Sequence, residues 1–166
     1  MSVTKNFRSI SRLKVVVDAI ELCSYTMDTC GKEDNFPKRS RWMLAEKIVN
    51  LSQEVVDHII KGNEIIVECT DDFLKRRAHQ RDAYGACESM LTFIAIAFVK
   101  YQLADNTVEF WTENTVHVET LIAKWRRRDL KTYQKFIPDG FQKDDVDFYG
   151  EQFEEDTEEA EDDLPF

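Results

Sequence analysis

The sequence predicts an all-α protein, an up-down-up-down bundle of four helices over residues 1–131 followed by a disordered acidic tail over residues 132–166. Four segments repeat apolar residues at the three-to-four spacing of one helix face, and short breaks separate them. Only 5 Gly and 3 Pro occur in 166 residues, which disfavours turn-rich β folds and Gly-looped nucleotide folds. Residues 144–166 hold twelve carboxylates and no Lys or Arg. Because the net charge of the whole chain is −10, the residues before this segment are together nearly neutral.

The first two helices are expected over residues 8–30 and 38–61. Apolar residues follow one face of the first helix, and Gly31 is suited to end it. Pro37 permits the second helix to begin, because a proline in the first turn loses no intrahelical hydrogen bond. The second helix is expected to end at Gly62, and residues 64–70 fit either an extension of it or an apolar plug.

The third helix is expected from Asp72 to Leu103, where Asp71 and Asp72 can cap free amide groups and favour the helix dipole. Its second half, residues 91–99, is apolar all round rather than striped. A helix of this kind must be covered on more than one side, and in a bundle of only four helices a subunit interface is a natural cover.

The fourth helix is expected from an N-cap at Asn106, with Glu109 at the third helical position, to about Asp129. Beyond Lys131 the helical pattern fades, and after Lys143 the composition is typical of a disordered acidic tail. The tail is interpreted either as a solubilising segment or as a docking peptide.

The cellular setting is expected to be the cytoplasm. The longest nearly apolar run, Leu91–Val99, is half of the ~20 residues that a membrane span requires, and basic residues interrupt the first segment where a secretory signal would be apolar. The four cysteines show no C-x-x-C pairing, which favours reduced and mostly buried thiols. No cofactor is implied.

Catalytic and metal-binding motifs of helical enzymes are missing from the sequence. The residues three before the histidines at positions 58, 79 and 117 are Val55, Arg76 and Asn114, so the Glu-x-x-His pairs of bundle di-iron sites are absent. The His-Glu-x-x-His motif of zinc proteases is absent too, and the Glu-x-x-Glu spacings lie only in the tail. The chain is therefore expected to be non-catalytic and to hold no metal.

Positive charge is expected to collect at one end of the bundle, called the base here, where the third helix starts and the fourth ends. Arginine suits phosphate because its planar fork donates two parallel hydrogen bonds, so these cations could bind an RNA backbone without reading its sequence. A solvated face whose cations complement the dipole of the fourth helix is equally consistent. The two basic clusters are Lys75, Arg76, Arg77 and Arg81, and Lys124, Arg126, Arg127 and Arg128.

The acidic tail leaves the fourth helix at the same base. Its tether raises the local concentration of its carboxylates beside the basic clusters to roughly millimolar. We therefore hypothesise that the tail competes with nucleic acid or restricts binding to the correct partner.

The segment Phe36–Trp42 (FPKRSRW), the following Leu44-x-x-Lys47-Ile48 and the helix-ending Gly62-Asn63 carry a family resemblance. Over about residues 8–130, the chain resembles the small four-helix bundles that include the accessory variability protein (Avd) of diversity-generating retroelements and the ribosomal RNA intervening-sequence proteins. The likeness extends to the tryptophan-bearing fourth helix and its basic end, residues 124–128.

This resemblance implies a non-catalytic bundle that assembles into a homopentameric barrel. In that family the barrel engages a reverse transcriptase and its template RNA and supports mutagenic cDNA synthesis, and the resemblance implies the same role here. The implied contact residues are the two basic clusters together with Lys38, Arg39 and Arg41. Family members of this type are usually strongly basic throughout, whereas this body is nearly neutral. The rival interpretation is a protein–protein adaptor whose tail recruits a partner, with no nucleic-acid role.

Overall fold

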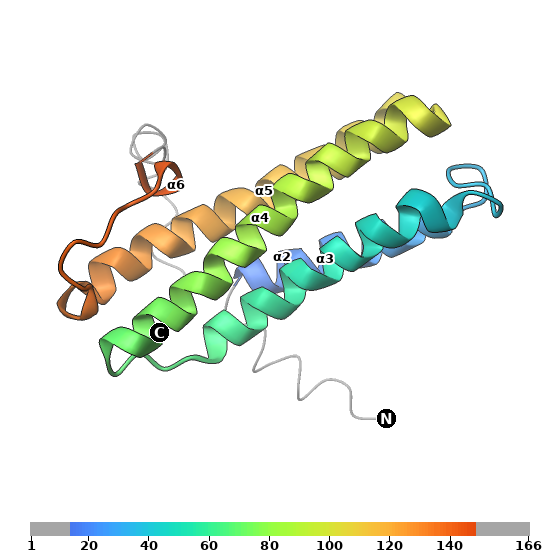
Figure 1. The fold of residues 1–166 in the computed structure, drawn as a ribbon. Coiled ribbons are helices and arrows are strands. Elements are labelled where there is room, and N and C mark those ends of the chain that lie inside the picture. The colour runs from blue at the N-terminus through green and yellow to red at the C-terminus, as the bar shows by residue number, and fades with distance from the viewer. Residues whose placement is uncertain (1–13, 149–166) are drawn as a thin grey trace, which may run out of the picture.

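The computed structural model describes residues 14–148, which form four long helices and two short ones. The long helices are α2 (Lys14–Gly31), α3 (Arg41–Glu64), α4 (Thr70–Tyr101) and α5 (Asp105–Thr132). α2 packs against α3 and α5, and α4 packs against the same two helices, so successive helices are also neighbours in space (Figure 1). The predicted up-down-up-down bundle is confirmed, and the described residues include no strand. Residues 8–13 of the expected first helix lie outside the described residues.

Several helix boundaries differ from the expected ones, including both ends of α4, which spans Thr70–Tyr101 rather than residues 72–103. α3 begins at Arg41 rather than residue 38, because residues 37–40 form a turn in which the amides of Ser40 and Arg41 both donate to the Pro37 carbonyl. α5 begins at Asp105, and its first free amides bond to the carbonyl of Ala104, so the expected cap at Asn106 is wrong. Residues 65–69 form a loop, and its Val67 is buried. This agrees with the expected apolar plug rather than with an extension of the second helix over the whole segment.

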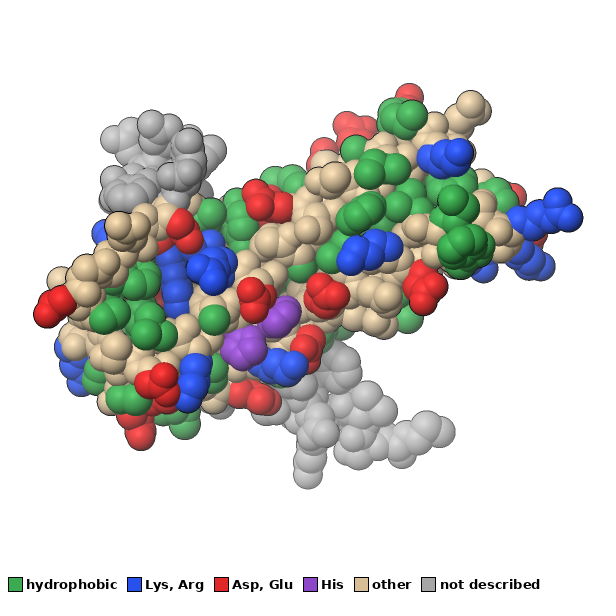
Figure 2. Space-filling view, in the orientation of Figure 1, with side chains coloured by type: hydrophobic (Ala, Val, Ile, Leu, Met, Phe, Trp, Pro, Cys, Tyr) green, Lys and Arg blue, Asp and Glu red, His purple; other side chains and the backbone are tan. Residues whose placement is uncertain are grey.

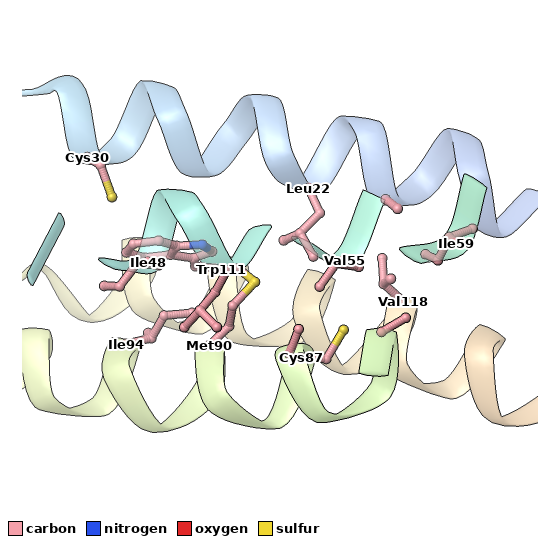
Figure 3. Packing of buried hydrophobic residues seen from close by; sticks show 14 of the residues in the cluster. Leu22, Cys30, Ile48, Val55, Ile59, Cys87, Met90, Ile94, Trp111 and Val118 are labelled. Carbon is pink, nitrogen blue, oxygen red and sulfur yellow. The ribbon is translucent and has the colours of Figure 1, made fainter. Parts of the chain in front are cut away.

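The main core runs along the bundle axis and takes side chains from all four long helices (Figure 3). Trp111 of α5 is its largest fully buried residue, and its indole Nε1 donates a 2.9 Å hydrogen bond to Oγ1 of Thr26 on α2. Burying a large apolar side chain contributes roughly 1.5–3 kcal/mol, and pairing the indole N–H avoids the desolvation cost of an unmade bond. Met90 and Ile94 of α4 complete this layer.

A second, smaller core closes the base of the bundle. Val67, Phe73 and Leu130 are buried there, and the chain beyond α5 folds back over them through the 3-10 helix η1 (Gln134–Phe136). The segment continues to the short helix α6 (Asp145–Phe148). The expected tail therefore begins with a packed stretch, because apolar residues of 133–141 cover the base: Tyr133, Phe136, Ile137 and Phe141.

Gly62 allows α3 and α4 to approach closely near the base. A Cβ at this position would lie 2.9 Å from a ring carbon of Trp125 and 3.2 Å from Cβ of His79. Neither contact can relax without moving a ring or a helix backbone, so the glycine is required by close approach rather than by backbone conformation. In α4, by contrast, a Cβ on Gly85 would meet nothing within 4 Å.

Gly62→Ala is expected to lower the free energy of unfolding by about 1–3 kcal/mol, because the added methyl group overlaps the Trp125 ring of α5 and crowds His79 of α4. Gly85→Ala is the matched control and is expected to raise it by up to about 1 kcal/mol through helix propensity alone. Chemical denaturation of the two variants beside the parent measures both changes. Equal effects of the two substitutions would contradict the packing role of Gly62.

Candidate functional site

The two basic clusters meet at the base, as antiparallel packing of α4 and α5 predicts. Arg77 of α4 donates from Nη1 to the backbone carbonyl of Arg126 on α5, over 3.3 Å. However, Arg76, Arg77 and Arg126 are buried, with exposed fractions of 7%, 7% and 1%. A buried guanidinium must be paired within the fold, because an uncompensated buried charge is very costly.

Arg76 joins three helices. Its Nε donates to Oδ2 of Asp129 on α5 over 2.6 Å, and its Nη1 donates to the carbonyl of Gly62 at the end of α3 over 3.0 Å. The guanidinium also lies 5.0 Å from the Trp125 ring centroid and 5.7 Å from that of Tyr133. This side chain therefore neutralises a buried carboxylate and satisfies a helix-terminal carbonyl at once.

Arg77 and Arg126 are paired with the beginning of the acidic segment. Arg77 donates from Nη2 to Oδ2 of Asp147, and Arg126 donates from Nη2 to Oδ2 of Asp144. Asp147 is itself buried, and its Oδ2 also accepts the backbone amide of Asp144 over 3.1 Å. We call these two ion pairs the acidic clasp. Both carboxylates of the clasp, Asp144 and Asp147, belong to the segment that was expected to be a disordered tail.

The charge states of the clasp follow from burial and proximity. Burial, and then the neighbouring charge of Arg77, lower the pKa of Arg126 below its ordinary value. Partial burial acts to raise the pKa of Asp144, but the hydrogen bond and charge of Arg126 outweigh it and the pKa lies below its ordinary value. Because the folded-state pKa of Asp144 is depressed, its contribution to stability is present above the ordinary Asp pKa and is lost as the pH falls through the folded-state pKa.

The expected contact surface at the base must therefore be corrected for Arg76, Arg77 and Arg126. Each of the three guanidinium groups donates within the fold rather than toward solvent, to Asp129, to the Arg126 carbonyl and Asp147, and to Asp144 respectively. Nε of Arg126 is buried without a hydrogen-bond partner. Arg127 is half-buried. Four cations of the two clusters remain exposed: Lys75, which pairs with Asp71 over 2.6 Å, and Arg81, Lys124 and Arg128.

Lys38, Arg39 and Arg41 lie at the opposite end of the bundle, beyond the start of α3, and are not brought together with the base. Arg41 donates from Nε and Nη2 to the carbonyl of Phe36, over 3.3 and 3.2 Å, and so closes the turn before α3. Lys38 forms an exposed pair with Glu33 at 3.4 Å, and Arg39 is exposed. Of these three cations, Arg41 has a structural role in the turn.

Large apolar side chains are exposed around that opposite end, which we call the apolar end. Val99 is 79% exposed, Trp42 70% and Met43 57%. On the face seen in Figure 2, hydrophobic side chains gather over the C-terminal half of α4 and the start of α3. Exposed apolar area of this kind on a folded domain marks an interaction site. The exposed residues of the apolar end come from all four long helices: Met27, Trp42, Met43, Ile96, Phe98, Val99, Phe110 and Val116.

α4 is the helix that contributes most to the apolar end. By length and composition it is the one described helix that could cross a membrane, with a mean hydropathy of 1.3 over its most apolar 18-residue window. The central helix of a soluble bundle passes the same criterion when neighbouring helices cover it. Here only 33% of the window is buried inside the bundle, and Ile96, Phe98 and Val99 within it are exposed.

A groove of about 460 Å³ runs between the end of α2 and the start of α3 at the apolar end. Trp42, Met27 and Val49 give it an apolar lining, and Lys38, Arg41 and Glu46 add charged groups at its rim. A mixed lining of this kind suits a protein side chain or helix better than a phosphate backbone.

Two of the four cysteines lie in the core. Cys30 and Cys87 are buried, and burial raises the pKa of the Cys30 thiol to about 12 and that of Cys87 still higher. Both thiols are therefore protonated at neutral pH and behave as small apolar core residues, as their positions on apolar helix faces predict.

Within residues 14–148, one group of side chains places three possible metal ligands together: His58 of α3 with His79 and Asp82 of α4. Sequence spacing did not reveal this group because two helices contribute to it. The available signal was the i, i+3 spacing of His79 and Asp82 on a helix that must pack antiparallel to the one carrying His58.

Asp129→Ala is expected to lower the free energy of unfolding by about 3–5 kcal/mol, because it leaves the Arg76 guanidinium buried without its carboxylate. Asp71→Ala breaks the exposed pair with Lys75 and removes a carboxylate from the first turn of α4, and is expected to cost no more than about 1 kcal/mol. Thermal and urea unfolding of both variants measure the difference. A small effect of Asp129→Ala would show that the base does not depend on this pair.

Comparisons of the chain with protein-family models, with curated proteins and with solved structures find no match. The functional proposals therefore rest on the bundle fold, the base, the apolar end and the sequence resemblance.

Proposed function

We propose that this protein is a non-catalytic, self-associating accessory subunit of a diversity-generating retroelement reverse transcriptase, acting in the cytoplasm. The bundle fold agrees with the fold that the sequence resemblance implies. The observation that carries the proposal is the apolar end, because its exposed side chains need a protein cover that the described residues do not provide.

The cover is a second copy of the same chain. Exposed apolar residues occur on all four long helices at the apolar end, so one copy presents more than one apolar contact surface there. A ring of more than two subunits requires two different contact surfaces on each copy, whereas a two-fold dimer uses one surface twice. The arrangement therefore favours a closed ring, and the homopentamer is the ring that the resemblance implies.

The polymerase and its template RNA are assigned to the exposed cations that remain after the acidic clasp has formed. At the base these are Lys75, Arg81, Lys124 and Arg128, and beyond the start of α3 they are Lys38 and Arg39. Contacts from such side chains to phosphate give affinity without sequence specificity. The buried arginines join this surface only if the clasp opens.

A protein–protein adaptor without a nucleic-acid role is the second candidate. The specific observation in its favour is that three arginines expected to contact RNA already have carboxylate partners within the chain. The acidic residues after α6 would then recruit a basic partner surface. RNA binding that weakens steeply with salt supports the first candidate, and no RNA binding at low salt supports the adaptor.

The parent chain is expected to show about five times 19.5 kDa by light scattering. Val99→Lys is expected to reduce this mass toward the monomer, because it places a charge in the apolar contact. Ile66→Lys is the matched control, since Ile66 is 78% exposed against 79% for Val99 but lies in the α3–α4 loop near the base. A monomeric parent, or equal effects of the two substitutions, would contradict assembly through the apolar end.

Replacing Asp144 and Asp147 together by Asn is expected to open the clasp and expose Arg77 and Arg126. Affinity for a single-stranded RNA at low salt should rise at least about tenfold, and two added phosphate contacts should steepen the salt slope by roughly 1.4. Fluorescence anisotropy over a salt series measures both quantities, and hydrogen exchange of residues 133–148 reports the opening.

The matched control replaces the exposed Asp34 and Asp139 by Asn, which changes the net charge equally without touching the clasp. An equal rise in RNA affinity for both double variants would mean that overall charge, not unmasking, is responsible. An open clasp without any gain in affinity would favour the adaptor.

A further inference from the structure

His58, His79 and Asp82 form a cluster on the outer face of the α3–α4 pair, away from both the acidic clasp and the apolar end. His79 and Asp82 are three residues apart on α4 and so share a helix face, while His58 comes from the antiparallel α3. Figure 2 shows the two histidines side by side on the surface with acidic side chains around them. The histidines are half-buried and Asp82 is exposed.

The distances in the cluster are those of a compact ligand set. Nδ1 of His58 lies 3.1 Å from Nδ1 of His79 and 3.9 Å from Oδ2 of Asp82, and one ligand atom from each residue falls within 4.8 Å of the others. In a tetrahedral zinc site with metal–ligand distances of 2.0–2.2 Å, the ligand atoms are about 3.3–3.6 Å apart. The histidine pair already has nearly this spacing, and the exposed Asp82 needs only a small side-chain rotation to reach it.

The two imidazoles face each other through the same type of nitrogen. Two Nδ1 atoms 3.1 Å apart cannot both present a lone pair without repulsion, so a hydrogen or a metal ion must lie between them. Either one ring carries its hydrogen on Nδ1 and donates an N–H···N hydrogen bond to the other, or both lone pairs bind a metal ion. The carboxylate of Asp82 beside them supplies the anionic ligand that a divalent metal prefers in addition to two neutral imidazoles.

The helix backbones hold the two histidines in place. Gly62 lies one turn after His58 on α3, and the absent Cβ at this glycine is what lets Cβ of His79 approach so closely. The close approach fixes the spacing of the two helices at the cluster, which is the rigidity that a metal site needs. The neighbouring Asp57 places a further carboxylate near the cluster, and it pairs with Lys61 over 2.6 Å.

We propose that His58, His79 and Asp82 bind one divalent transition-metal ion per chain, with Zn²⁺ as the probe. The two Nδ1 atoms and one oxygen of Asp82 supply three ligands, and a water molecule completes the tetrahedron on the solvent side. The ion ties α3 to α4 near the base and stabilises the bundle there. This inference is independent of the proposed retroelement function.

Titration calorimetry of the full, tag-free chain with Zn²⁺ tests the proposal. One ion is expected to bind per chain, and His58→Ala, His79→Ala and Asp82→Asn are each expected to weaken binding at least about tenfold. His117→Ala is the matched control: His117 contacts the single carboxylate of Asp18 at 2.7 Å on another face and should leave Zn²⁺ affinity unchanged. All proteins carry Cys69→Ser, since Cys69 is exposed and could bind zinc itself.

Two further readouts separate a metal site from a structural hydrogen bond. Zn²⁺ should raise the Tm of the parent and of the His117 variant but not of the His79 variant, and Co²⁺ should give a tetrahedral absorption band in the same two proteins only. No Zn²⁺ binding by the parent, or equal binding by the His58, His79 and Asp82 variants, would overturn the proposal and leave the pair as a shared-proton hydrogen bond. If the histidine variants fail to fold, the exposed Asp82→Asn decides the question alone.

Discussion

The buried carboxylate of Asp129 is the constraint on which the base of the molecule depends. It accepts hydrogen bonds from Arg76 and from Nε2 of Gln80, both on α4, and so locks the end of α5 to the beginning of α4. Through Arg76 the same network reaches the carbonyl of Gly62 at the end of α3. A carboxylate and a guanidinium at this depth are tolerable only together, so three helix ends must be in register before either charge can be buried. The close α3–α4 approach at Gly62, which also sets the histidine pair, depends on that register.

The bundle has two chemically different ends. At the base, charges are paired inside the fold and a small apolar core is covered by residues 133–141. At the apolar end the reverse holds, because large side chains such as Trp42 and Val99 remain exposed while the main core below them is complete. The bundle therefore pairs several charges inside the base and leaves large apolar side chains exposed at the apolar end, the opposite of their usual distribution in a monomer.

Helical periodicity was enough to predict the four helices and their antiparallel order, since each apolar stripe had one face to bury. The uncovered half of α4 was also predictable, because residues 91–99 are apolar all round. The helix start at Asp105 was not predicted, because the helix begins without a capping side chain. Its first hydrogen bonds are made by backbone amides to the carbonyl of Ala104, which leaves no signal in the sequence. The burial of the three arginines was not predicted, for a different reason. Assigning Arg76, Arg77 and Arg126 to one end of the bundle fixes where they lie along the axis, but not which way they point. The histidine pair depends on the close crossing at Gly62, and no single helix contains that information.

The acidic clasp also has a consequence for the order in which the protein is made. Asp144 and Asp147 follow all four long helices in the chain, so they are synthesised after Arg77 and Arg126 and leave the ribosome after them. Until both carboxylates have emerged, Arg77 and Arg126 lack their clasp partners. The emerging chain is then more basic than the finished one and attracts polyanions more strongly.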